Sequence, residues 1–283
     1  MKKIIYINIA VALFFCVNYD AKSQNVLDGV FTPEHTTNRQ VIPYAHLREA
    51  DVMWLKRIWR EVDLRQKLNH TMFYPEKPMQ GRKNLFDVIK DAITKDGTLT
   101  AYSTGALGDD DMFTQELTLA EVNDLLSEEI VQYAEDPNTG EMIETKINKD
   151  VSAADVKKYQ IKEEWFFDRQ RSVMDVRIIG ICPLVDEYNE YGEFKGSKKL
   201  FWIYFPEARY VFKNAEVYNR FNDTERRTYE DIFWKRQFSS YIIKESNVYD
   251  RSIAEHKVGL DALLEAEKIE EKIFNMEHDL WEF

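Results

Sequence analysis

Cysteine is scarce in this sequence, which holds only Cys16 and Cys182 among 283 residues. Cys16 lies in an N-terminal leader that we expect to be removed, so the mature chain would carry one thiol and no intramolecular disulfide. A reactive thiol needs a neighbouring base or cation, and the apolar flanks of Cys182 favour a buried structural residue instead. It would end the apolar face of a predicted strand formed by Met174, Val176, Ile178, Gly180 and Cys182.

Long apolar runs are also missing, since spanning a bilayer takes about 20 residues and the best candidate, 4–17, is shorter and contains Asn8. Two lysines precede this run, and the small residues Ala21 and Ser23 follow it. The pattern is typical of a secretory signal peptide cleaved after residue 23. We therefore expect 1–23 to be a signal peptide and the mature chain to be secreted and soluble.

Motifs of the common enzyme classes are absent. The sequence has no glycine-rich phosphate loop, no G-x-S-x-G and no H-E-x-x-H. Its five histidines are scattered, without a second ligand at the spacing of a zinc helix. The acidic turns at 109–111 and 136–140 lack the complete twelve-residue calcium loop, which favours solvated turns. The sequence thus predicts no catalytic, metal or cofactor site.

Basic residues are fewer than acidic ones: the sequence has 38 Lys and Arg against 50 Asp and Glu, and its formal net charge is −12. Loss of residues 1–23 would remove three lysines and one aspartate and leave −14. Most of the excess lies in 103–150, which has thirteen acidic residues and two lysines. This balance argues against binding to nucleic acid or an anionic membrane. We expect 103–150 to be mobile or insertion-like.

Hydrophobic residues are plentiful at 44%, enough for one large domain after a polar leader over 24–44. The patterns predict an α+β domain over 45–283, in which a mainly antiparallel sheet packs with helices and a long amphipathic helix ends the chain. Predicted helices cover 45–69, 84–97, 117–134, 152–159, 206–219, 228–238 and 263–280. Predicted strands cover 98–103, 159–167, 173–182, 199–206 and 239–250. The turn between the second and third strands would hold Asp168, Arg169 and Arg171, which would pair with each other or with a partner; the pattern favours a salt bridge among them.

Several blocks of the sequence, in the same order, resemble the gliding-motility family called GldN or PorN. They include ADVMWLKRIWREVDLRQKLNHTMFYPE, DVSAADVKKYQIKEEWFFDRQRS, LFWIYFPEARYVF and FSSYIIKESNVYDRSI. The resemblance implies a non-catalytic periplasmic subunit of the type IX secretion and gliding machinery, which self-associates in a ring with a GldK-like (PorK-like) outer-membrane lipoprotein. It also implies contact with GldM-like (PorM-like) and GldL-like (PorL-like) inner-membrane components, and it brings no cofactor.

The resemblance supplies motif positions but no catalytic residues. The matched positions, whose individual roles it leaves open, are Trp165, Phe166, Asp168, Arg171, Phe205, Pro206 and Arg209. Two other classes of function stay open from the residues alone. A cell-wall or glycan-binding module would use exposed aromatics such as Trp54, Trp202 or Trp234 in a groove. A secreted hydrolase would instead need a concave pocket with strongly perturbed carboxylates.

Overall fold

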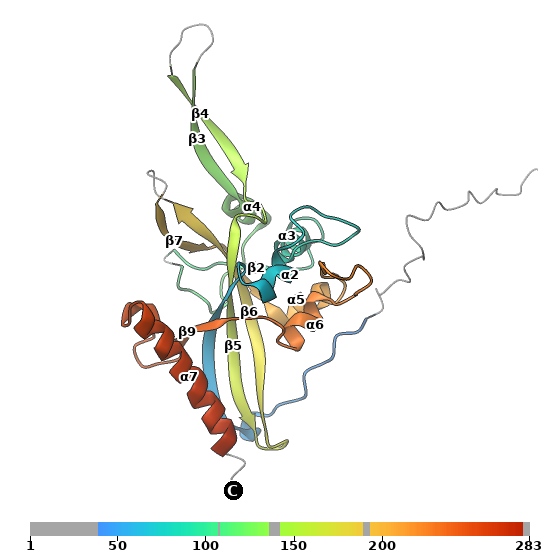
Figure 1. Ribbon diagram of the computed structural model, residues 1–283, viewed down its shortest axis with the longest axis vertical. Helices are drawn as coiled ribbons and strands as arrows, with labels where there is room; N and C mark the ends of the chain where they lie inside the picture. Colours follow the sequence, from blue (N-terminus) through green and yellow to red (C-terminus); the bar gives the residue numbers. More distant parts are fainter. Residues whose placement is uncertain (1–38, 107, 136–141, 189–192, 280–283) are drawn as a thin grey trace, which may run out of the picture. The chain divides into compact units, whose positions relative to one another are not determined.

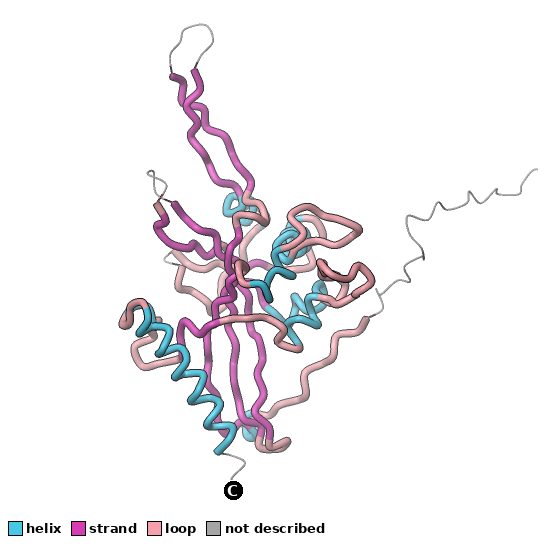
Figure 2. The backbone as a smooth tube through the Cα atoms, in the orientation of Figure 1, coloured by secondary structure: helices cyan, strands magenta, loops and turns pink. Residues whose placement is uncertain are grey.

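A computed structural model describes residues 39–106, 108–135, 142–188 and 193–279 (Figure 1). The predicted signal peptide, most of the polar leader and the turn at 136–140 lie outside the described residues. Residues 39–283 form one compact unit. Within its described part, six α-helices accompany a seven-stranded sheet, so the fold is α+β as the sequence predicts (Figure 2).

The main sheet is antiparallel at every described pairing and runs in the order β2-β8-β6-β5-β1-β9, with β7 also beside β6. Its strands are β1 Val52–Asp63, β2 Ala101–Tyr102, β5 Val156–Asp168, β6 Val173–Tyr188, β7 Phe194–Lys199, β8 Trp202–Tyr204 and β9 Tyr241–Glu245. A separate hairpin consists of β3 Ser127–Glu135 and β4 Met142–Asp150. The predicted hairpin around 168–173 is confirmed as β5 and β6.

Two apolar clusters attach the helices to the sheet. The helices are α2 His70–Phe73, α3 Leu85–Thr94, α4 Leu119–Leu126, α5 Phe205–Phe212, α6 Tyr229–Trp234 and α7 Leu260–Asp279, with 3-10 turns at Glu49–Asp51, Lys67–Asn69 and Ile253–Glu255. The larger cluster joins α3, α5 and α6 to sheet residues such as Val62 and Ile161. The smaller one joins α7, through Ile269 and Ile273, to Ile58 of β1. The predicted long C-terminal helix is confirmed.

The helix predicted over 45–69 is wrong, because its centre is strand β1. The apolar spacing in this segment fits a helix, but β1 is buried on both faces over residues 58–62, which removes the alternation expected of a strand. Charges that suggested a solvated helix face form cross-strand ion pairs instead. Arg57 pairs with Glu164 at 2.5 Å and Arg60 with Glu163 at 2.6 Å.

Two further helix predictions need correction. The segment 152–159 opens with a turn in which the Ser152 hydroxyl donates to Asp155 at 2.7 Å, and strand β5 begins at Val156. The segment 117–134 is helical only as far as Leu126, and β3 then begins at Ser127. Ser152, expected to cap a helix, caps only a turn. In both segments strand pairing decides the conformation of the later residues.

Cys182 is fully buried, as its apolar flanks predict, and burial raises the pKa of its thiol to about 12. It packs with Trp59 and Trp202, whereas Ile178 belongs to the core on the helix side of the sheet. The register shifts between the pairs Lys162–Gly180 and Glu163–Ile178, which leaves Ile179 as an extra residue. This bulge moves Cys182 to the opposite face from Ile178, so the single predicted face is wrong.

Part of the acidic stretch packs against the sheet. The ring of Phe113 lies 6.0 Å from that of Trp202 and over Gly180, where an added Cβ would come within 2.4 Å of the ring. Asp111 accepts hydrogen bonds from the indole of Trp59 at 2.5 Å and from Lys162 at 3.1 Å. The loop between β2 and α4 therefore closes over the face that carries Cys182.

Candidate functional site

Three residues from distant parts of the chain form a stacked cluster around Arg209, one of the matched positions. The guanidinium of Arg209 lies 4.3 Å from the centre of the Tyr44 ring and 4.8 Å from that of Trp234. Tyr44 and Trp234 stack on each other at 5.5 Å. Arg209 also pairs with Glu230 at 2.7 Å and donates to the carbonyl of Ile42 at 2.6 Å. One buried arginine thus ties the leader to α5 and α6.

The cluster continues across the sheet through Arg177 on β6. Its guanidinium lies 4.9 Å from the Tyr44 ring and 5.2 Å from the ring of Phe166, a second matched position. Arg177 also donates to the carbonyl of Ala45 at 2.6 Å. Tyr44 therefore lies between two arginines, and burial raises the pKa of its hydroxyl. We call Tyr44, Phe166, Arg177, Arg209 and Trp234 the arginine clamp.

Three large apolar or aromatic side chains, each a member of the arginine clamp or close to one in sequence, are exposed. Tyr210 on α5 is 63% exposed and Trp234 is 41% exposed, while Ile42 is also largely exposed. Aromatic and arginine side chains are enriched among the residues that dominate binding energy at protein interfaces. The composition of this surface therefore fits protein recognition.

Trp165, another matched position, lies in a different place, within a buried ionic network. Its indole donates to Glu163 at 2.8 Å. Glu163 is fully buried and pairs with Arg60 at 2.6 Å and Arg236 at 2.8 Å. Arg60 also reaches Glu270 on α7 at 3.3 Å. The network therefore connects β1, β5, the segment after α6, and the C-terminal helix.

The other matched positions contribute to local structure and to the hydrophobic core. Asp168 and Arg171 form the predicted ion pair at 2.6 Å in the β5–β6 turn. The hydrogen bond from Arg171 is the main reason that the pKa of Asp168 is lowered. Phe205 is buried in the main core, and Pro206 stands in the first turn of α5, where a missing N–H costs no hydrogen bond.

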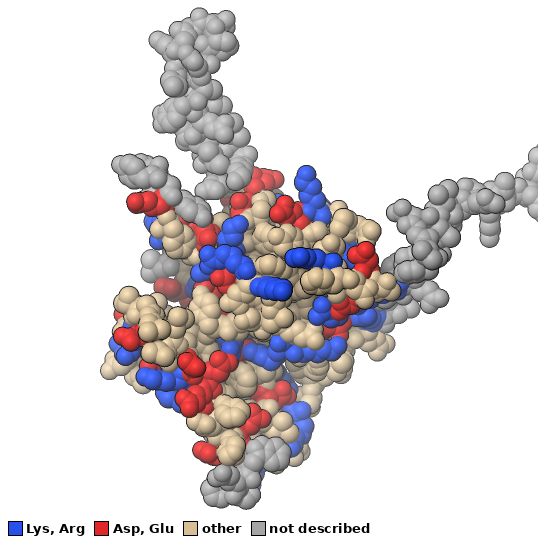
Figure 3. Space-filling view, in the orientation of Figure 1, with Lys and Arg blue, Asp and Glu red and all other residues tan. Residues whose placement is uncertain are grey.

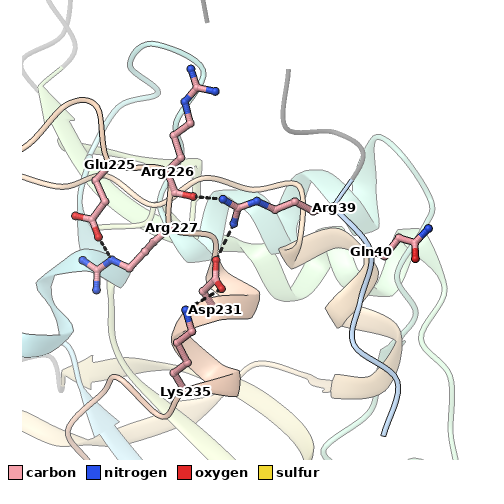
Figure 4. Close-up of a pocket in the computed structure, with 7 residues that line it drawn as sticks. All are labelled: Arg39, Gln40, Glu225, Arg226, Arg227, Asp231 and Lys235. Atoms are coloured by element: carbon pink, nitrogen blue, oxygen red, sulfur yellow. Dashed lines mark hydrogen bonds and ion pairs between the residues drawn. The ribbon is translucent and has the colours of Figure 1, made fainter. Parts of the chain in front are cut away.

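A shallow cleft of about 490 Å³ lies beside α6, lined by Arg39, Gln40, Glu225, Arg226, Arg227, Asp231 and Lys235 (Figure 4). Its charges are largely paired with one another. Arg39 binds Asp231 at 2.7 Å, and Lys235 binds the same carboxylate at 3.3 Å. Arg227 pairs with Glu225. This arrangement holds residue 39 against α6, and the ion pairs engage most of the charged groups that line the cleft.

The sequence matches the family described as gliding motility associated protein GldN over residues 47–282, which is most of the chain. The chain belongs to the GldN family. No curated protein shows significant similarity to it. Membership makes this GldN-family chain a component associated with gliding motility, and all seven matched motif positions lie inside the matched range. No helix in the described part of the chain is both long and apolar enough to cross a membrane.

The arginine clamp of this GldN-family chain contains two of the seven motif positions, Phe166 and Arg209, while Asp168 and Arg171 meet separately in the β5–β6 turn. Sequence reasoning missed Tyr44, Arg177 and Trp234 as members of the same cluster. Tyr44 falls in a segment read as a polar leader, just before the range that matches the family. The sequence did contain one indication of this cluster. Arginine and aromatic residues occur near the matched positions, and these residue types favour cation–π stacking. Their proximity, however, depends on the fold.

Proposed function

We propose that this chain is a non-catalytic structural subunit of the type IX protein secretion and gliding machinery. In this proposal residues 1–23 are a signal peptide, 24–44 a polar leader and 45–283 a single domain in the periplasm. The subunit forms a ring complex with a GldK-like (PorK-like) outer-membrane lipoprotein. It also contacts GldM-like and GldL-like inner-membrane components. Membership of the GldN family is the observation that carries the proposal.

The surface beside the arginine clamp supports a role in protein assembly. Its exposed residues Tyr210 and Trp234 stand next to an arginine that neighbouring groups hold in place. Anchors that are rigid before binding lose little conformational entropy when a partner covers them. We propose this surface as the one that meets the lipoprotein.

The carboxylates give little support to the hydrolase alternative. In the described part of the chain, every carboxylate with a clearly displaced pKa has that pKa lowered: Asp63, Asp91, Glu121, Glu163, Asp168, Asp231 and Glu255. A carboxyl group that acts as a general acid near neutral pH needs a raised pKa instead. Ion pairs and capping hydrogen bonds account for the observed direction, which fits structural carboxylates.

The tryptophans give little support to the glycan-binding alternative. Trp202 is buried in the cluster around Cys182, and Trp54 packs against the cluster beneath α7. Trp234 is partly exposed but stacks on Tyr44. A sugar platform made from these three residues would need them exposed in one groove.

Deletion of the gene tests the proposed role in living cells. We expect the deletion strain to lose both gliding and export of type IX cargo, because a missing ring subunit interrupts the whole machine. A plasmid copy of the complete chain should restore both. The measurements are colony spreading and cargo in the culture medium, with general envelope integrity as the control. A deletion strain that glides and secretes normally would contradict the proposal.

A further inference from the structure

The segment between α5 and α6 presents one aromatic side chain far into solvent. Phe221 is 81% exposed, and the guanidinium of Arg220 lies 5.3 Å from its ring. We call residues 217–227 the Phe221 loop. An isolated exposed aromatic is common, but this one stands at the tip of a loop that many hydrogen bonds hold in one conformation.

The base of the Phe221 loop is fixed by a buried arginine from a different part of the chain. Arg82 donates to the carbonyls of Asp223 at 2.6 Å and Glu225 at 3.1 Å, and its side chain is only 8% exposed. The N–H of Val217 donates to the carbonyl of Arg227 at 2.8 Å, which closes the loop. The loop is therefore anchored to the domain at its neck.

The tip of the loop is braced by an asparagine. The side chain of Asn219 accepts from the N–H of Phe221 at 2.9 Å and donates to Glu225. Asn222 accepts in the same way from the N–H of Thr224 at 3.0 Å. These local hydrogen bonds restrict the conformations of the unbound loop. They therefore lower the conformational entropy lost when its aromatic residue docks. The loop has the properties of a preformed anchor.

The same chain carries a surface with complementary chemistry at the start of α7. Leu260 is 71% exposed, and Leu263 and Leu264 are also exposed, so three leucines at helical spacing face solvent together. We call them the leucine patch. Asp261 and Glu267, both exposed, flank the patch with negative charge. In Figure 3, uncharged side chains dominate the surface over the start of α7, and acidic ones gather further along it.

The Phe221 loop and the leucine patch lie far apart within one molecule, because α7 and the segment between α5 and α6 stand at opposite lateral edges of the view in Figure 1. We propose that the Phe221 loop of one copy docks on the leucine patch of a second copy. Phe221 would cover the leucines, and Arg220 and Arg226 would face Asp261 and Glu267. A contact between two different surfaces is head-to-tail and leads to a ring or a filament.

This inference deepens the proposed ring subunit and rests on that proposal for its biological setting, but its test needs only this chain. We expect the purified full chain to self-associate beyond a dimer as its concentration rises, observed by sedimentation velocity. Phe221→Ala should weaken the association about 30-fold, the effect of losing one dominant interface anchor. A double variant of the patch, Leu260→Ser with Leu263→Ser, should weaken it similarly. Phe194→Ala, which truncates an exposed phenylalanine on β7, is the control and should change nothing.

A mixture of the two defective chains gives the sharper result. The Phe221→Ala chain keeps an intact patch, and the patch variant keeps an intact loop, so together they should form a pair that stops at two copies. A wild-type chain that stays monomeric, or a mixture that stays monomeric, would overturn the loop-to-patch contact. Binding to the lipoprotein is a separate measurement: if it fails while self-association persists, the proposed function falls and the loop contact stands.

Discussion

Replacing Glu163 with glutamine is expected to lower the free energy of unfolding at pH 7 by about 3–5 kcal/mol, the range found when one member of a buried ion pair is lost. Glu163 is fully buried and accepts from Arg60, Arg236 and the indole of Trp165. Glutamine keeps the volume of the side chain but leaves two arginines without their shared counter-charge. Urea unfolding followed by tryptophan fluorescence measures the change.

The neighbouring residue provides a matched control. Glu164 lies on the opposite face of β5, is partly exposed and pairs with Arg57 at 2.5 Å. Because solvent screens a partly exposed pair, Glu164→Gln should cost about 1 kcal/mol or less. Equal effects of the two substitutions would contradict the structural importance of the buried network.

The effect of Glu163→Gln should depend on pH. Burial alone would raise the pKa of Glu163, but the charges of Arg236 and Arg60 outweigh it and lower the pKa below its ordinary value. A lowered folded-state pKa contributes stability that is present above the unfolded-state pKa and lost as the pH falls through the folded one. The difference between wild type and variant should therefore shrink below about pH 4. A difference that stays constant as the pH falls further below that value would contradict the ionised state of Glu163.

Replacing Arg209 with lysine is expected to open the arginine clamp and to abolish binding to the GldK-like lipoprotein. Lysine cannot stack on Tyr44 and Trp234 while it also pairs with Glu230 and reaches the carbonyl of Ile42. We expect a loss of about 2–3 kcal/mol, from one charged hydrogen bond and two cation–π contacts. Amide hydrogen exchange of residues 42–46 should accelerate, since these residues would leave the domain surface.

Arg251 offers a control for this substitution, because it stacks on the exposed Tyr249 at 4.9 Å without a buried partner. Arg251→Lys should leave exchange at 42–46 and lipoprotein binding unchanged. If Arg209→Lys binds the lipoprotein as wild type does while residues 42–46 exchange rapidly, the arginine clamp does not form part of that interface.

The sequence predicts contacts between residues that are close in the chain, but it does not predict contacts that form only when distant strands pair in the sheet. The β5–β6 hairpin and the Asp168–Arg171 pair result from alternation and a turn a few residues long. Strand β1 does not, because its pairing with β5 joins residues about 105 positions apart. Most of its charged side chains find their partners on distant elements, namely β5, β9 and α7. The bulge opposite Lys162 likewise lies beside Gly180, which the ring of Phe113 covers, and no short pattern contains a contact between residues so far apart in sequence.

The candidate site shows the same limit. The family blocks mark Phe166 and Arg209, but they do not indicate that a tyrosine from the leader lies between Arg209 and Arg177. Ring stacking of this kind has no spacing rule, because its members come from β5, β6, α5, α6 and the segment before β1. The family resemblance and the missing catalytic motifs favoured an interaction subunit, and the fold was needed to bring the members of the arginine clamp together.

The most direct test of the central claim, that this chain is a structural subunit bound to an outer-membrane lipoprotein, is a reconstitution with purified proteins. The complete chain and the GldK-like lipoprotein from the same cell, in detergent, are mixed and separated by size-exclusion chromatography with light scattering. We expect a large complex that contains both proteins in a fixed ratio. Separate elution of the two proteins, each well folded by circular dichroism, would contradict the claim.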